Sequence, residues 1–320
     1  MFFSGGADGA VRVWDAGQMR PAVSFEVGEL VYDVQMSPCT SSGALLASAS
    51  SEPGVRLLDL RTGSSAHILP GYSGVVRTVR WSPNHQHCLL SGGLDGHLKL
   101  WDVRRGCIAT CRTDPRLITS LLSSRSSSTP LSSSSAPSSS FTKARPRKLA
   151  RGRLHRDVDD SRGAAAAAAA RGGYALAHYG PVAAALWHPS GAEFFSLGGD
   201  LLAHRWSATD GSPLQSPWAT LPRAPASPDG ACMARQAGCV FLASGPVIRL
   251  LDSRTSAELT PPLKGHFSEV VACAYNPGLD ELYSLDKDGL AVVWRPPRPS
   301  LPAPSSFDTQ DNWSDQDDYS

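Results

Sequence analysis

Apolar and polar residues alternate in short stretches along most of the chain, and each stretch ends at turn-forming residues. Residues 75–81 alternate as an amphipathic strand that Ser82-Pro83-Asn84 ends, residues 88–92 and 98–101 form two further apolar runs, and Asp95-Gly96 separates them. Period-two patterns bounded by such turns predict β-strands and hairpins. No apolar run approaches the roughly 20 residues of a membrane helix. We therefore expect an all-β fold built from short strands.

The same order of strands and turns recurs along the chain at a nearly constant interval. Neighbouring copies are 44, 43, 45 and 43 residues apart when they are aligned on the last large apolar position of each copy. A period of about 40–45 residues is typical of WD repeats, each of which forms one four-stranded blade of a β-propeller. We expect a propeller that is seven-bladed in the full-length parent, with about five and a half repeats present here. The aligned positions are Trp14, Leu58, Trp101, Trp206, Leu251 and Trp294.

Two segments interrupt or follow the repeats and predict the domain boundaries. Trp101 and Trp206 are 105 residues apart, about 61 more than one repeat, and residues 123–140 contain 12 serines. Such low-complexity sequence has too little apolar surface to offset the entropy lost on ordering. We expect WD repeats over 1–112 (the first one incomplete), a disordered Ser/basic/Ala insertion over 113–173, WD repeats over 174–296, and a disordered Pro-rich, acidic tail over 297–320.

The first repeat begins at its middle strand, since Phe2 and Phe3 already belong to that strand pattern. We therefore expect a chain that is shortened at its N terminus relative to the parent. The chain is almost neutral, because 30 Lys and Arg residues balance 29 Asp and Glu residues, for a net charge of +1. This balance provides no broad electrostatic footprint for nucleic acid or a membrane surface. The seven cysteines are scattered singly and are expected to be reduced thiols.

Serine, aspartate and tryptophan keep one order in several repeats, as in Ser4/Asp8/Trp14 and Ser284/Asp288/Trp294, and Gly265-His266 precedes the last copy. Ser, His and Asp also form hydrolase triads. However, these residues recur at the repeat period without a G-x-S-x-G motif, which favours a structural hydrogen-bond network over catalysis. His85-x-His87-Cys88 lacks a second ligand pair at zinc spacing. We expect no catalytic residues, metal or cofactor, and keep a hydrolase only as a third hypothesis.

Several segments, taken in order, resemble the Cockayne syndrome A (excision-repair cross-complementing group 8) family of WD-repeat proteins. They are residues 63–69, 79–83, 98–105 and 263–266, and the resemblance extends over about residues 2–112 and 177–295 plus the acidic tail. It implies a non-enzymatic substrate receptor of a cullin-RING ubiquitin ligase that acts in transcription-coupled nucleotide excision repair. The alternative is a generic WD-repeat interaction scaffold without a link to a ligase.

The resemblance also implies partners and a docking site. In such receptors a W-D-x-R box faces the damaged-DNA-binding-protein adaptor, and Trp101, Asp102 and Arg104 match it here. Arg61 and Arg254 occupy the same offset without the tryptophan and are secondary candidates. The stalled RNA polymerase II repair complex and the Cockayne syndrome B protein are implied as further partners. The basic run over 143–156 resembles a nuclear localisation signal or, equally well, a solvated linker, and we expect a nuclear protein.

Overall fold

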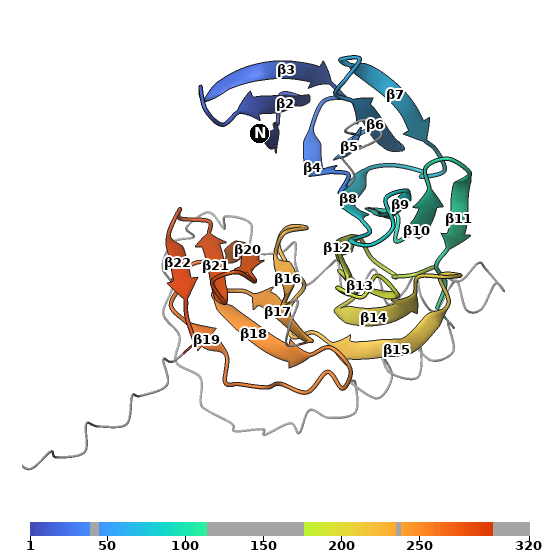
Figure 1. Cartoon of the computed structure of the whole chain (residues 1–320). Helices are drawn as coiled ribbons and strands as arrows, with labels where there is room; N and C mark the ends of the chain where they lie inside the picture. The colour runs from blue at the N-terminus through green and yellow to red at the C-terminus, as the bar shows by residue number, and fades with distance from the viewer. Residues whose placement is uncertain (39–44, 114–175, 235–237, 297–320) are drawn as a thin grey trace, which may run out of the picture.

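A computed structural model describes residues 1–38, 45–113, 176–234 and 238–296 (Figure 1). In these ranges every regular element is a strand, and the strands form six antiparallel sheets arranged in an open ring, with a gap between the sheet of β1 and the sheet of β22. The all-β WD-repeat β-propeller is therefore confirmed. In the same ranges there is no helix long and apolar enough to span a membrane. The low-complexity stretch over 123–140, the basic run and the C-terminal tail lie outside the described residues.

Each of the first three sheets is formed by consecutive strands, and the sheets follow one another in the order of the chain. In the second and third sheets the first strand is innermost and the fourth is outermost (Figure 1). Their bounds are β1 Phe2–Gly5, β2 Ala10–Asp15 and β3 Arg20–Glu26; β4 Val31–Met36, β5 Leu45–Ser50, β6 Val55–Asp59 and β7 Ser64–Leu69; and β8 Val76–Trp81, β9 Cys88–Gly93, β10 Leu98–Asp102 and β11 Gly106–Thr110.

The other three sheets follow the same order along the chain. The fourth and fifth sheets have four strands and the sixth has three among the described residues. Their bounds are β12 Val182–Trp187, β13 Glu193–Gly198, β14 Leu202–Ser207 and β15 Pro213–Thr220; β16 Ala231–Ala234, β17 Cys239–Ser244, β18 Val247–Asp252 and β19 Leu263–Lys264; and β20 Val270–Asn276, β21 Glu281–Asp286 and β22 Ala291–Trp294.

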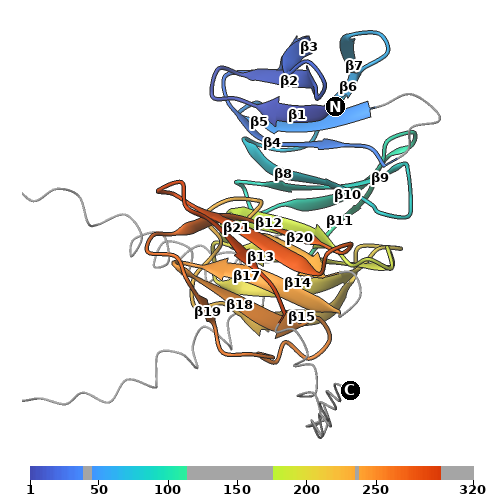
Figure 2. The same cartoon turned by 60° about the vertical axis from the view of Figure 1, so that its left-hand side comes forward.

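The hydrophobic core is divided among the interfaces between neighbouring blades. One cluster joins Leu57 and Leu69 of the second blade to Val79 and Trp81 of the third, and four similar clusters join the other neighbouring pairs. This is the expected consequence of the repeat, because a single blade cannot bury its apolar face alone. Figure 2 shows the blades following one another around the ring, with β4, β8 and β12 as neighbouring strands.

Two glycines of the third blade allow the fourth blade to approach closely. A Cβ atom on Gly92 would lie 2.5 Å from the side chain of Val182, and one on Gly96 would lie 2.2 Å from the carbonyl oxygen of His178. Gly96 also has a φ of 79°, in the left-handed region that glycine adopts without strain. The Asp95-Gly96 turn expected from the sequence is therefore also a packing contact between blades.

Candidate functional site

The W-D-x-R box lies where β10 turns into β11, and its three residues have different surroundings. Trp101 is 2% exposed, and its indole N–H donates to Ser91 Oγ at 2.7 Å. Asp102 is buried and accepts the backbone N–H of Arg104 at 2.9 Å. The Arg104 side chain is 60% exposed. Trp101 and Asp102 thus build the blade and its turn, and Arg104 is the member of the box that a partner can reach.

Asp102 also places a negative charge inside the turn. Burial raises the pKa of its carboxyl, but the hydrogen bond from the Arg104 backbone and the nearby guanidinium outweigh burial, so the pKa lies below its usual range. Asp102 is therefore ionised at neutral pH, and Arg104 Nε lies 3.5 Å from its Oδ1. The rest of the guanidinium keeps donors for a partner. Such a planar fork suits a carboxylate or two backbone carbonyl oxygens.

A cavity of about 600 Å³ lies beside Arg104. The loop between β8 and β9 forms one side of it, so the His85-x-His87-Cys88 motif shares this cavity with Arg104. The basic and hydrogen-bonding groups in its wall suit a polar or acidic segment of a partner better than an apolar one. The lining residues are Pro38, Pro83, Asn84, His85, Gln86, His87, Cys88, Asp102 and Arg104.

The secondary candidates Arg61 and Arg254 have the same turn geometry as Arg104. Their backbone N–H groups donate to Asp59 Oδ1 at 2.8 Å and to Asp252 Oδ1 at 2.9 Å, respectively. The Arg61 side chain is 76% exposed. Asp15 closes the equivalent turn of the first blade by accepting the backbone N–H of Gly17 at 2.8 Å. The aspartate that ends β2, β6, β10 and β18 therefore closes the following turn in the same way, whichever residue lies two positions later.

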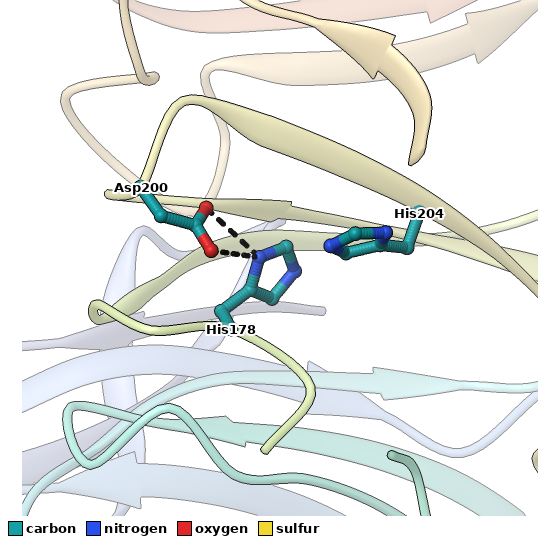
Figure 3. A group of neighbouring side chains, drawn as sticks. All are labelled: His178, Asp200 and His204. Atoms are coloured by element: carbon teal, nitrogen blue, oxygen red, sulfur yellow. Dashed lines mark hydrogen bonds and ion pairs between the residues drawn. The ribbon is translucent and has the colours of Figure 1, made fainter. Parts of the chain in front are cut away.

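The Ser-His-Asp-Trp network expected from the sequence is complete in the fourth blade, where only its tryptophan, Trp206, was identified from the sequence. His178 Nε2 lies 2.7 Å from Ser196 Oγ and its Nδ1 lies 3.1 Å from Asp200 Oδ1 (Figure 3), while the indole N–H of Trp206 donates to Ser196 Oγ at 2.8 Å. An alanine precedes His178 in place of the glycine of Gly265-His266. A signal was nevertheless present, because His178 and Trp206 are 28 residues apart, as are His266 and Trp294.

The sixth blade has the same network, with one correction to the expected acid. His266 Nε2 lies 2.6 Å from Ser284 Oγ, and its Nδ1 lies 3.0 Å from Asp286 Oδ2. The expectation of Asp288, which rested on the recurring order of serine, Asp-Gly and tryptophan, was wrong. Ser284 and Trp294 are ten residues apart, as are Ser196 and Trp206, but the acid lies two residues earlier in the sixth blade, at the end of β21. The backbone N–H of Asp288 itself donates to Asp286 Oδ1 at 3.1 Å.

These networks stabilise the blades, and their hydrogen bonds engage the groups that a catalytic or metal site would use. Side-chain atoms of His178, Asp200 and His204 lie within 4.8 Å of one another, as a metal site would require (Figure 3). However, Asp200 and Ser196 engage both ring nitrogens of His178. Burial and the adjacent His178 lower the pKa of His204 to about 3, and its ring packs against the Trp206 indole with 5.7 Å between the ring centroids. Ser196 and Ser284 are 0% and 4% exposed, which keeps a hydrolase substrate from either hydroxyl.

A second cavity, of about 620 Å³, lies among the innermost strands. Arg80 of β8 extends across this region and forms ion pairs with Asp33 of β4 and with Asp229, which precedes β16; the Arg80 Nη2 to Asp229 Oδ1 distance is 2.6 Å. Arg80 therefore links the second, third and fifth blades. Sequence reasoning missed this network because its members are 47 and 149 residues apart and follow no local pattern.

The fold, the repeat and the buried networks define the class: the chain is a WD-repeat protein with a β-propeller fold. The WD domain, G-beta repeat family matches residues 63–102. The WD repeat-containing protein ATCSA-1 of Arabidopsis thaliana is 26% identical, over 98% of this chain and 74% of that protein.

Shorter matches cover a third of the chain or less. The F-box/WD repeat-containing protein sel-10 of Caenorhabditis elegans is 29% identical over 33% of this chain and 17% of its own length. The Radiation-sensitive protein 28 of Saccharomyces cerevisiae is 28% identical over 32% of this chain and 22% of its own length. Apart from the plant protein, the chain thus spans a quarter or less of these relatives. WD-repeat propellers generally mediate protein–protein interactions, so the exposed residues of the blades and turns are the candidates for partner binding.

Proposed function

We propose that this chain is the substrate-recognition subunit of a cullin-RING ubiquitin ligase that acts in transcription-coupled nucleotide excision repair. The observation that carries the proposal is the W-D-x-R turn. Asp102 holds the turn from within while Arg104 extends 60% exposed beside a polar cavity of about 600 Å³. The plant WD repeat-containing protein, which aligns with 98% of this chain, and the worm F-box/WD repeat-containing protein are consistent with a receptor of this kind.

In this proposal the chain performs no chemistry and works by holding two partners together. The guanidinium of Arg104 pairs with a carboxylate or with backbone carbonyls of the damaged-DNA-binding-protein adaptor, and the histidines of the adjacent cavity contact the same segment. Other surfaces of the propeller receive the stalled RNA polymerase II repair complex and the Cockayne syndrome B protein. The site of action is the nucleus. The basic run that would direct the chain there lies outside the described residues.

Co-precipitation of the purified chain with the adaptor tests the docking site. A charge-assisted hydrogen bond contributes about 1.5–3 kcal/mol, so Arg104→Ala should weaken adaptor binding by roughly tenfold or more, and Arg104→Glu should weaken it further. Arg105→Ala is the matched control, because Arg105 is the next residue of the same turn and is also exposed. Adaptor binding that is unchanged by both Arg104 variants would contradict the assigned site.

The alternative, a scaffold without a link to a ligase, is favoured by the range of WD-repeat relatives. One match, 35% identical over 32% of this chain, is a ribosome biogenesis protein homologue of Chlamydomonas reinhardtii. A scaffold of that kind would bind its partners equally well with and without the adaptor. Failure of the unmodified chain to bind the adaptor in the same experiment would favour the scaffold over the ligase subunit.

A further inference from the structure

Two cysteines from neighbouring blades meet in the wall of the central cavity of about 620 Å³. Cys232 lies on β16, the innermost strand of the fifth blade, and Cys273 lies on β20, the innermost strand of the sixth. Both are free thiols; Cys273 is 6% exposed, and Cys232 is only partly buried. Both also belong to one apolar cluster with Ile248 at the interface between these blades.

The two side chains pack in the same cluster, and β16 and β20 are neighbouring strands. The adjacent Cys232 thiol and burial raise the pKa of Cys273 well above its usual range. Backbone contacts fix the arrangement, because the backbone N–H of Cys273 donates to the carbonyl oxygen of Asp229 at 2.8 Å, three residues before Cys232. The packing of the two strands therefore places both cysteine side chains in one cluster at the wall of the cavity. A disulfide requires this kind of proximity between two side chains that point toward each other.

We propose that Cys232 and Cys273 form a redox-modification site, at which hydrogen peroxide converts the dithiol to a disulfide that links the fifth blade to the sixth. The thiolate of Cys232 attacks one peroxide oxygen and the O–O bond breaks. The departing hydroxide takes up the proton that Cys232 released, which gives Cys232 sulfenic acid and one water. The sulfur of Cys273 then attacks the Cys232 sulfur, the S–O bond breaks, and the proton of Cys273 leaves with hydroxide as a second water.

The order of the two steps follows from exposure and protonation. Peroxide reaches Cys232 first because this side chain is the more exposed of the pair. Cys273 remains a buried thiol until the adjacent sulfenic acid offers it an electrophilic sulfur. Two-electron oxidation of this kind is reversible by a dithiol reductant.

The position of the pair gives the disulfide a structural consequence. Asp229 accepts the backbone N–H of Cys273, and its carboxylate pairs with Arg80 across the central cavity. A covalent link between Cys232 and Cys273 therefore restrains the segment that holds one end of this ion pair. Oxidation would tighten the contact between the last two blades and the wall of the cavity at the same time.

Peptide mapping of the full chain tests the proposal. Trypsin places Cys232 alone in peptide 224–235 and Cys273 alone in peptide 265–287. The folded chain is treated with excess hydrogen peroxide, alkylated, and digested without reductant. We expect both peptides to lose alkylation to the same extent. A linked species should appear with the summed mass of the two peptides less two hydrogen atoms, and dithiothreitol should remove it.

Two variants sharpen the test. Cys232→Ser should abolish the linked species and leave Cys273 alkylated after peroxide treatment, whereas Cys107→Ser, a change at an exposed cysteine of the third blade, should leave the link unchanged. The proposal is overturned if wild-type Cys232 and Cys273 remain alkylated after peroxide treatment. It is equally overturned if Cys232 is recovered in a disulfide with a different cysteine.

Discussion

Replacement of Arg80 by methionine tests whether the cross-cavity ion pairs stabilise the propeller. Met keeps much of the length of the arginine side chain but removes its charge. In the wild type the Arg80 and Asp33 side chains are 13% and 4% exposed, so the substitution leaves a buried carboxylate without its counter-charge. The backbone N–H of Val79 still donates to Asp33 at 2.9 Å and provides partial compensation.

The expected loss follows from the burial of each partner. Breaking a buried ion pair by removing one member costs about 3–5 kcal/mol of unfolding free energy. The second pair contributes little, because Asp229 is 64% exposed and exposed pairs are worth about 0.2–1 kcal/mol. We therefore expect Arg80→Met to lower the unfolding free energy by about 3 kcal/mol or more at neutral pH.

The loss should depend on pH with a defined sign. Burial raises the pKa of Asp33 although Arg80 opposes this effect, so the native-state contribution of Asp33 is fully present below its unfolded value of about 3.9 and is lost as the pH rises through the folded value. Without Arg80 the folded pKa of Asp33 rises further. The difference in unfolding free energy between Arg80→Met and the wild type should therefore shrink as the pH is lowered through the folded pKa of Asp33 in the variant. A protonated Asp33 needs no counter-charge.

Urea unfolding followed by tryptophan fluorescence measures the effect near Arg80, since the indole N–H of Trp187 donates to the Arg80 carbonyl oxygen at 2.9 Å. The double variant Asp33→Asn/Arg80→Met removes both charges and should recover about 2 kcal/mol of the loss. Arg20→Met, at an exposed residue of β3, is the control and should change stability by no more than about 0.5 kcal/mol. A loss below about 1 kcal/mol, or a double variant no more stable than Arg80→Met, would refute the reasoning.

Two further predictions concern the buried networks and use the same unfolding assay. Ser196→Ala leaves the Trp206 indole N–H and a His178 ring nitrogen without their partner and should cost about 1–3 kcal/mol, whereas Ser190→Ala, at an exposed serine, should change little; equal effects would contradict the network. Asp286→Ala should cost about 1–3 kcal/mol and Asp288→Ala no more than about 0.5 kcal/mol, and the reverse order would restore Asp288 as the acid that orients His266.

The strands of the propeller could be predicted because their signals are local. The alternation over residues 75–81 and the Asp95-Gly96 turn each depend on neighbouring residues, and the structure confirms them as β8 and as the turn between β9 and β10. The repeat interval then extends the same pattern around the ring. The choice of Asp288 over Asp286 failed because the Asp-Gly pair of the turn does not provide the acid in this blade: the carboxylate that contacts His266 lies two residues earlier, at the end of β21.

The contacts that cross the ring could not be predicted in this way. Arg80 pairs with Asp33 and Asp229, and Cys232 meets Cys273, because the ring brings together strands that are distant along the chain. No periodic pattern marks such positions, since each depends on which side chains happen to face the same cavity. His178 is an intermediate case: its distance from Trp206 matches that between His266 and Trp294, but the long insertion separates it from the preceding repeat.

The W-D-x-R box depends both on a local sequence signal and on contacts that only the tertiary fold creates. Its aspartate is explained by folding alone, because Asp15, Asp59, Asp102 and Asp252 each close a turn by accepting a backbone N–H two residues later. An exposed arginine two residues after such an aspartate is therefore not by itself evidence of a site that binds the adaptor. If the turn explained the whole motif, then Arg61→Ala, Arg254→Ala and Arg104→Ala would affect adaptor binding equally. A selective effect of Arg104→Ala would instead trace recognition to the cavity formed with the loop of His85 and His87, which depends on the tertiary fold.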